Sequence, residues 1–359
     1  MKKLVLVCTI LAALFCSTTH ATIWRVNGNP NIDADFHDLQ AAIDDPYVFP
    51  YDTLYVEGYS NSYGSSIAVN KPLVLIGTGY FLNENDTTQA IKLQSWISSI
   101  YFQAGSEGSE LTGFYIHADY GNLVVIETYG ITISNNRIYS QFNYNYGNIQ
   151  GITIIGTGPD PIVIAKNYIY CRNTAGGGYS DAWGIRHSDG IAANVVIKNN
   201  YIAALAGWTE RSIQIYKDDP ANQIVIFNNV LVNDLLCQYG SVYNNIMVEG
   251  SLSGNYNIYE YNIGNGTQFP AGNGNQQNVN MALVFINHNS GIDNGLKLSP
   301  VSPAKGAGMN GTDCGMFGGN TPYVLSGIPE VPSIFEIDYT GVGSASVPIQ
   351  VNLKAKSNK

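Results

Sequence analysis

Apolar and polar residues alternate in a pattern that returns several times in the middle of the chain. In the stretch 131–139, Ile131 and Ile133 lie two residues apart, and a pair of Asn residues follows them. Near copies of this stretch begin at Ile162, Val195 and Ile224, and a looser copy begins at Ser241. Residues two apart on a strand face the same side, and β-branched side chains suit a pleated surface. Each copy therefore predicts a short strand with one apolar face that ends at an Asn corner.

The second Asn of each copy is expected to form a ladder inside a stack of coils. The copies are separated by 31, 33, 29 and 16 residues, which predicts stacked coils with loops of variable length. One strand cannot bury its apolar face alone, whereas stacking at ~4.8 Å buries a continuous column. Asn tolerates a left-handed bend and can pass amide hydrogen bonds to the Asn above and below. The expected ladder residues are Asn136, Asn167, Asn200, Asn229 and Asn245.

The two ends of the chain carry different patterns from the repeats. Residues 1–21 have two Lys, an apolar run and small residues before Ala21, which predicts a secretory signal peptide. Cleavage after Ala21 is favoured over lipidation at Cys16, because bulky Phe15 precedes that Cys. Residues 22–51 are expected to form an N-terminal cap whose helix spans 35–45 with Asp35 as N-cap. The β-helix is assigned to 52–318, and 319–359 is a strand-forming tail that either packs on the β-helix or leads to a partner.

These features together resemble the right-handed parallel β-helix proteins of the pectate lyase-like superfamily. The resemblance rests on the Asn ladder, the apolar columns, and the opening and closing segments: Phe36, Leu39–Gln40, Ala42–Ile43, Asp52–Thr53, Asn70–Pro72, 299–308 and 313–318. It implies an all-β, single-stranded right-handed parallel β-helix of the pectin lyase-like type, with the helix and tail described above. It also implies that sugar chains would lie on one strand face, where enzymes of the superfamily use an Arg or Lys as the base.

That strand face can be located by counting back from the Asn corners. Three preceding strands contain inward Ile152, Ile185 and Ile213, followed by Ile154, His187 and Ile215. Thr153, Arg186 and Gln214 would then form one outward column. Arg186 is the candidate catalytic base and Asp181 the candidate orienting acid. The alternatives are that Arg186 is a solvated or ion-paired residue and that His187 is a core histidine.

The segments before this face are expected to be stacked loops that bind sugar. Flat aromatic rings beside charged groups suit a sugar ring, whose C–H face is apolar and whose rim is polar. The candidate substrate-binding residues are Tyr144, Tyr146, Arg172, Tyr179, Trp183, Trp208, Glu210, Arg211 and Gln214. Packing of the loops is an equal alternative for the Tyr and Trp residues.

Composition narrows the function further. A net charge of -10 argues against nucleic acid as a partner and counts mildly against acidic polysaccharides. Three Cys residues remain after the leader, and buried unpaired thiols are expected. The sequence indicates no certain cofactor. Calcium, which several lyases of the superfamily use, is a possible one, although the outward column has no acidic residue to bind it. Asp181, Asp189, Asp218 and Asp219 would have to reach a metal from loops.

Two hypotheses follow. The first is a secreted or extracytoplasmic β-helix, in the periplasm or at the cell surface, that interacts with polysaccharide as a binding protein or a lyase. The second is a non-catalytic surface or structural protein that self-associates. It rests on the column Thr132, Val163, Val196 and Val225, which should face outward although it is mostly apolar. Either the tail or another molecule would cover this column. The mature chain has no expected transmembrane anchor.

Overall fold

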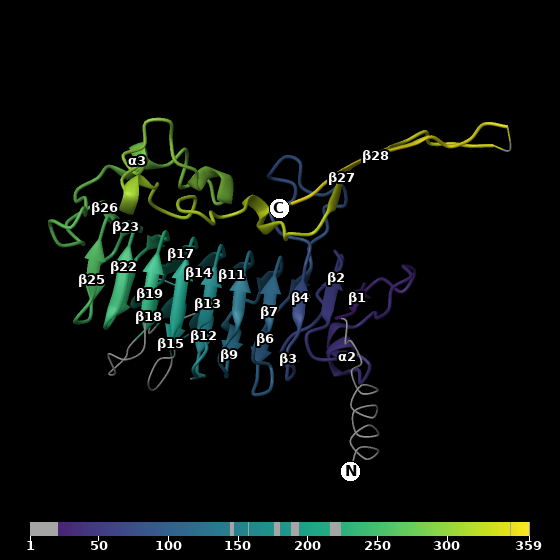
Figure 1. Cartoon of the computed structure of the whole chain (residues 1–359), viewed down its shortest axis with the longest axis horizontal. Coiled ribbons are helices and arrows are strands. Elements are labelled where there is room, and N and C mark those ends of the chain that lie inside the picture. Colours follow the sequence, from purple (N-terminus) through teal and green to yellow (C-terminus); the bar gives the residue numbers. More distant parts are fainter. Residues whose placement is uncertain are drawn as a thin grey trace, which may run out of the picture.

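The structure is a computed structural model that describes residues 21–143, 147–156, 158–175, 180–187, 194–215, 224–344 and 346–358. Within these residues the chain coils through three parallel sheets of ten, eight and eight strands, which run side by side along one axis (Figure 1). Each regular coil passes from sheet A to sheet C and then to sheet B. This arrangement confirms the all-β, right-handed parallel β-helix.

The strands of each sheet stack in sequence order, coil upon coil. Sheet A contains β1 (Ile23–Val26), β2 (Thr53–Val56), β4 (Val74–Ile76), β7 (Glu110–Thr112), β10 (Thr132–Ser134), β13 (Ile162–Ala165), β16 (Val195–Lys198), β19 (Ile224–Phe227), β22 (Gly240–Tyr243) and β25 (Ile258–Glu260). Sheet C contains β5 (Trp96–Ile97), β8 (Tyr115–His117), β11 (Arg137–Phe142), β14 (Tyr168–Asn173), β17 (Tyr201–Leu205), β20 (Val230–Val232), β23 (Ile246–Glu249) and β26 (Ile263–Gly264). Sheet B contains β3 (Ile67–Val69), β6 (Ile100–Phe102), β9 (Gly121–Ile126), β12 (Asn148–Ile154), β15 (Asp181–His187), β18 (Thr209–Ile215), β21 (Asp234–Cys237) and β24 (Leu252–Ser253).

The Asn ladder lies at the corner between sheets A and C and is completely buried over the five predicted residues. The side-chain amide of Asn167 donates to Oδ1 of Asn200 over 3.0 Å, and Asn200 donates to Asn229 over the same distance. The ladder also continues two rungs beyond the predicted residues, through Asn262 and Asn275. The sequence copies around these two Asn residues are too degraded to match the repeat, although the corner geometry is kept.

The left-handed bend at this corner belongs to the residue before the ladder Asn. These residues have φ of 53° at Asn135, 58° at Lys166, 54° at Asn199, 54° at Asn228 and 57° at Asn244. One Asn was predicted to supply both the bend and the ladder hydrogen bonds, whereas the structure divides them between two neighbouring residues. The first Asn supplies backbone conformation and the second supplies side-chain hydrogen bonds, which explains why the Asn residues come in pairs.

Lys166 is the exception in this column, and it carries a testable consequence. Lys in the left-handed region is strained, whereas Asn tolerates it, so Lys166→Asn is expected to raise the free energy of unfolding by about 0.5–1 kcal/mol. Urea unfolding followed by circular dichroism measures the change. Lys198→Asn makes the same chemical change in strand β16, where φ is not positive, and should not stabilise the protein. Equal effects of the two substitutions would contradict the strain argument.

The inward and outward registers agree with the sequence prediction. Ile152, Ile185 and Ile213 are all fully buried in the core. In the sheet B register Thr153 pairs with Arg186, and Arg186 pairs with Gln214. His187 lies on the inward side and is 3% exposed, in line with a core histidine.

The N-terminal capping helix is shorter than predicted. Helix α2 spans Leu39–Asp44, and its N-cap is Asp38, whose carboxylate accepts from the Ala41 N–H over 2.8 Å. Asp35, the predicted N-cap, instead accepts from the Arg25 N–H over 2.7 Å. The segment before α2 therefore pairs with β1 rather than entering the helix. Leu39 and Ile43 still face the core, so the expected capping face is present.

The closing segment is a correction to the predicted domain boundary at residue 318. Among the described residues the strands of the three sheets end at β26, and residues 299–318 do not form a last coil. Instead the chain from α3 (Met281–Val284) onward turns back over the outside of sheet C (Figure 1). Phe285, Leu296 and Met316 pack there against outward residues of sheet C, such as Tyr201. Apolar residues at 281–325 thus form a second core outside the coils.

The returning segment is fastened to the ladder corner and to the first coils. The Asn199 amide donates to the carbonyls of Met316 and Gly318 over 3.0 and 2.8 Å. Farther on, Asp293, in the 3-10 helix η1 (Asp293–Leu296), accepts from the Asn85 amide over 2.7 Å and from the Ser326 N–H over 2.6 Å. The Tyr323 hydroxyl also donates to Asp293, over 3.1 Å. We call this buried group around Asp293, which also contains Asn85, Tyr323 and Ser326, the clasp.

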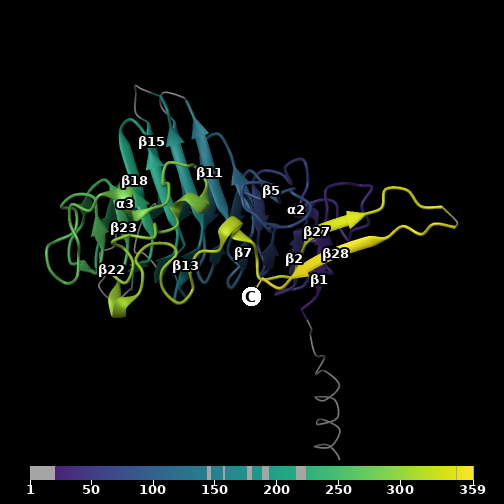
Figure 2. The ribbon, with the colours of Figure 1, turned by 90° about the horizontal axis from the view of Figure 1, so that it is seen from above.

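The apolar column on sheet A has the predicted register, and the tail lies beside part of it. Thr132 pairs with Val163, Val163 with Val196, and Val196 with Val225. Tail residues 321 and 329–331 line a groove of about 360 Å³ together with Thr132 and Val163. The rest of the tail is an antiparallel hairpin that projects past the first coils (Figures 1 and 2). The first residues of the tail therefore pack on the β-helix, as one of the two alternatives predicted, and a partner for the rest of the tail stays a prediction. Where the chain is described, none of its helices is long and apolar enough to cross a bilayer.

Candidate functional site

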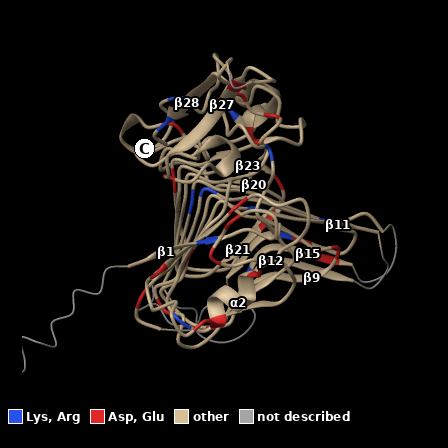
Figure 3. Cartoon of the chain, turned by 90° about the vertical axis from the view of Figure 1, so that its right-hand side faces the viewer, with Lys and Arg blue, Asp and Glu red and all other residues tan. Residues whose placement is uncertain are grey.

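The middle coils carry a flange, in which strands of sheets C and B extend beyond the body and pack against each other (Figures 2 and 3). The flange consists of the outer ends of β11, β14 and β17 and the first residues of β12, β15 and β18. Small residues let the two layers approach. A Cβ on Gly184 would lie 2.3 Å from Cγ2 of Ile202 in sheet C, and one on Gly151 would lie 3.2 Å from Sγ of Cys171.

The flange corrects the expectation that the site residues stand on loops. Arg172 lies in β14, Trp183 in β15, and Glu210 and Arg211 in β18. Their ladders continue past the corner, for example between Arg172 and Leu205, because the flange supplies a packed inner face. Tyr144, Tyr146 and Tyr179 lie outside the described residues, as do Asp189, Asp218 and Asp219.

On the sheet B side, four predicted site residues form one cluster. The guanidinium of Arg186 lies 4.3 Å from the centre of the Trp183 ring. Trp183 Nε1 and Arg211 both donate to the side-chain oxygen of Gln214, over 2.8 and 2.6 Å. Within the described residues Nε of Arg186 is buried without a hydrogen-bond partner. The cluster therefore fixes a cation against an aromatic face.

The structure does not bring the two predicted catalytic residues together. Asp181 and Arg186 lie five residues apart on strand β15, which corresponds to about 16 Å along a strand. Asp181 pairs in register with Asn148 and Thr209 near the flange edge, away from Gln214. An acid at that distance cannot orient Arg186 through a hydrogen bond. The catalytic roles of both residues stay predictions.

Arg172 and Glu210 both lie at the edge of the flange. They line a cleft of about 370 Å³ with residues of the two strand ends, including Thr174 and Leu205. Burial raises the pKa of Glu210, and the Ala206 N–H, which donates to its carboxylate over 2.6 Å, opposes that rise. Trp208 follows the β17 strand at the turn and is 68% exposed. The predicted binding residues are thus divided between two sides of the flange.

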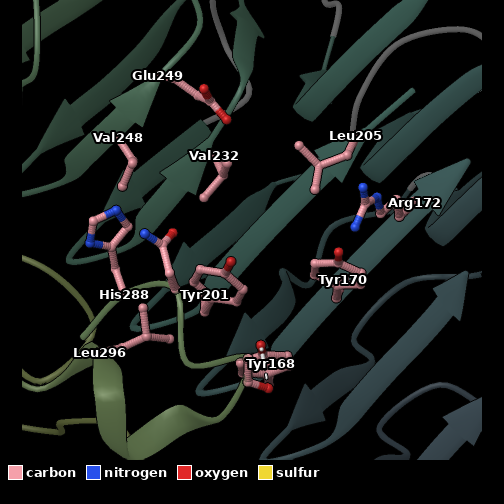
Figure 4. A pocket seen from close by; sticks show the side chains of 12 residues that line it. Tyr168, Tyr170, Arg172, Tyr201, Leu205, Val232, Val248, Glu249, His288 and Leu296 are labelled. Carbon is pink, nitrogen blue, oxygen red and sulfur yellow. Dashed lines mark hydrogen bonds between the residues drawn. The ribbon is translucent and has the colours of Figure 1, made fainter. Parts of the chain in front are cut away.

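A second cleft, of about 380 Å³, lies on the outer face of sheet C next to Arg172 (Figure 4). Its lining residues come from four successive strands and from the segment that covers them: Tyr168, Tyr170, Arg172, Tyr201, Leu205, Val232, Val248, Glu249, His288, Asn289, Gly291 and Leu296. We call it the sheet C cleft. Leu205 and Arg172 also line the flange cleft, so the two hollows adjoin.

The sheet C cleft arises where an aromatic ladder stops. The rings of Tyr139 and Tyr170 stack with centroids 5.4 Å apart and planes 10° from parallel. The next residues in this column are Ala203 and Val232. The short side chain of Ala203 cannot continue the stack, so the second face of the Tyr170 ring borders the cleft (Figure 4).

The covering segment forms the opposite wall of the sheet C cleft. The Tyr168 hydroxyl donates to the carbonyl of Gly291 over 3.2 Å and so ties this segment to the sheet. The side chain of His288 lies at the mouth of the cleft, and its ring is 5.8 Å from that of Phe285. The second core beneath, around Leu296, holds the segment in place.

Charge and hydrogen-bonding groups are placed at the rim of the cleft. Arg172 and Glu249 occupy separated positions along it, and His288 lies on the covering side (Figure 4). Burial raises the pKa of Tyr168 and of Tyr201, so both keep their protons at neutral pH and can donate or accept hydrogen bonds. The cleft thus has an aromatic wall, an apolar base and a polar rim.

Sequence reasoning missed most residues of this cleft. The signal was present in part, because Tyr168, Tyr170 and Tyr201 stand one or three residues after a ladder Asn. Alternation after the corner would have placed them on the outward face of the next strand. Glu249 and His288 carried no such signal, since only the returning segment brings residue 288 to sheet C.

The described residues were compared with the predicted possibility of a metal site. Those residues contain no group of three or more His, Cys, Asp or Glu side chains placed to hold a metal ion. Calcium stays an expectation of the resemblance.

Similarity to known proteins is found in the structure and not in the sequence. No protein-family model matches the sequence, and no curated protein sequence matches it. A solved structure described as the crystal structure of pectate lyase Pel9A covers 86% of this chain and 97% of its own, with a TM-score of 0.41 and 14% sequence identity. The likeness lies in the fold.

Proposed function

We propose that this protein is a glycan-binding β-helix and that the sheet C cleft holds one or two sugar units of a polysaccharide. The observation that carries the proposal is the free face of Tyr170 beside a cleft of about 380 Å³ with a polar rim. An aromatic face packs against the C–H face of a sugar, and Arg172, Glu249 and Asn289 can bond its hydroxyl groups. The leader at residues 1–21 supports exposure of this site to extracytoplasmic polysaccharide.

The chemistry of the cleft favours binding of a neutral glycan over hydrolysis. Glu249 is the one carboxylate among the described residues that line it, whereas glycoside hydrolysis uses a pair of carboxyl groups. Its negative charge and the net charge of -10 also disfavour uronate polymers, although Arg172 offsets this locally. The flange cleft beside it can hold further units of the same chain, since the two share Arg172 and Leu205.

Polysaccharide lyase activity at Arg186 is the second candidate. It is favoured by the cluster on sheet B, where Nε of Arg186 is buried without a hydrogen-bond partner among the described residues. Arg186→Ala should abolish turnover in this case and leave binding in the sheet C cleft intact.

A single assay separates the two candidates. The mature protein is exposed to neutral glycans, pectate and alginate while retained binding and unsaturated products are recorded, and oligosaccharides of the retained polymer are then titrated by calorimetry. We expect retention of a neutral polymer without product. Product from one polymer would replace the binding proposal by a lyase, and absence of both signals would contradict the two candidates together.

Substitution of Tyr170 tests where the sugar lies. Tyr170→Ala removes the aromatic wall and is expected to weaken binding at least about tenfold, a loss of about 1.4 kcal/mol. Tyr170→Phe keeps the ring and should bind within about threefold of the original protein. Tyr256→Ala removes a Tyr that is 72% exposed at a distant corner and should have no effect. Unchanged affinity in folded Tyr170→Ala would rule out the sheet C cleft.

A further inference from the structure

The strands of the C-terminal hairpin contact mainly each other. It consists of β27 (Ser333–Tyr339) and β28 (Val351–Lys356), which pair antiparallel. Its base is attached to the first coils, where the Ala90 N–H donates to the Ile334 carbonyl over 2.8 Å. From there it extends past strand β1 into solvent (Figures 1 and 2).

The two faces of the hairpin differ in character. On one face Glu336 and Lys354 form an ion pair of 2.6 Å, and Asp338 lies opposite Asn352. On the other face the register pairs Ile337 with Leu353 and Tyr339 with Val351, and alternation adds further apolar residues. This apolar face consists of Ile334, Ile337, Tyr339, Val347, Ile349, Val351, Leu353 and Ala355. The charged residues of the two strands all lie on the opposite face.

Exposure of this large apolar face to water is unfavourable in free energy. Tyr339 is 69% exposed and Leu353 is 58% exposed, and the other large side chains of the face are 41–58% exposed. With roughly 100 Å² open on each large side chain, the face offers on the order of 700 Å², close to the ~800 Å² that each partner buries in a stable interface. An isolated two-stranded hairpin is also only marginally stable without a covered face.

We propose that a second copy of this chain covers the face, with two hairpins packed apolar face to apolar face. An uncharged face of this kind complements itself, so a two-fold axis can bring the same apolar face of both copies together. Two such ribbons would form a small sandwich with the layers about 10 Å apart. The hairpin projects beyond the body and away from the strands that line the sheet C cleft (Figure 1). We therefore expect contact between two hairpins to leave the cleft of each copy accessible.

Charge placed on either face distinguishes this proposal from other modes of association. The full mature chain is examined by sedimentation and light scattering at concentrations up to about 100 μM. A dimer is expected. Leu353→Asp puts a carboxylate into the interface and should raise the dissociation constant at least about tenfold. Gln350→Asp adds the same charge on the polar face, opposite the uncharged Thr340, and should leave the dissociation constant unchanged.

Hydrogen exchange of residues 333–356 supplies a second readout. In the dimer, protection of this segment should rise with protein concentration and fall in Leu353→Asp. A monomer at all concentrations would overturn the proposal. If the hairpin amides of such a monomer were protected from exchange, the apolar face would be covered by the body of the same chain. A dimer that Leu353→Asp leaves intact would also overturn the proposal, because another surface would then hold the copies together.

Discussion

Asn200→Ala is expected to lower the free energy of unfolding by about 3–5 kcal/mol, because it removes a middle rung of the buried ladder. Oδ1 of Asn200 accepts from both the N–H and the side-chain amide of Asn167, over 2.8 and 3.0 Å. Its own amide donates to the carbonyls of Ile164 and Lys198, each over 2.9 Å. Water cannot replace these bonds at a fully buried site, so donors and carbonyls of two coils would lose partners.

Urea unfolding followed by circular dichroism measures this loss, and position along the ladder provides an internal comparison. Asn275→Ala removes the last rung, which is only half-buried, and should cost about 1–2 kcal/mol. Asn61→Ala removes an exposed amide outside the ladder and should change stability by less than about 0.5 kcal/mol. Equal losses at Asn200 and Asn275 would show that burial in the ladder is not the cause.

Asp293→Ala is expected to cost about 2–4 kcal/mol through the clasp. The carboxylate accepts from the Asn85 amide, the Ser326 N–H and the Tyr323 hydroxyl, and the substitution would leave these buried donors without an acceptor. Unfolding measures the loss, and limited proteolysis near residue 85 reports release of the clasp. Asp86→Ala, at the exposed neighbouring position, is the matched control. Stability equal to that of the control would show that the clasp does not hold the ends of the chain.

The clasp also predicts a pH dependence of a definite sign. Burial raises the pKa of Asp293, and the three donated hydrogen bonds only partly oppose the rise. The unfolded pKa is about 3.9, so above that pH the folded chain holds this proton more tightly than the unfolded chain. Stability from this group should therefore fall as pH rises from about 4 through the raised pKa. Asp293→Asn has no such proton and should lose this part of the slope; an unchanged slope would contradict the assignment.

Much of the β-helix followed from local sequence, because each coil repeats the same environment. Ile152 and Ile185 could be placed inward and Arg186 outward simply by counting from the Asn corners. The same counting failed where packing between distant segments decides the structure. The flange turned predicted loops into strands, since Gly184 and its neighbours allow two sheets to meet beyond the core.

The candidate site was less predictable than the fold for the same reason. Arg186 and Gln214 were expected side by side, because one strand column connects them, and the structure adds Trp183, predicted on a preceding loop, to the same cluster. The sheet C cleft depends on the returning segment, and no local sequence pattern predicts that residues near 288 line a cleft with Tyr170. A cleft between elements far apart in sequence requires the tertiary structure.

The returning segment also changes the order in which the molecule can assemble. Stacked coils ordinarily gain stability one neighbour at a time and can unravel from either end. Here the Asn85 amide donates a hydrogen bond to the Ser326 hydroxyl, 241 residues later in the chain. The first coils therefore complete their contacts only after the C-terminal segment has folded onto them. Folding must therefore finish at the C-terminal segment even though the N-terminal coils are made first. Both ends then open together, as one cooperative unit.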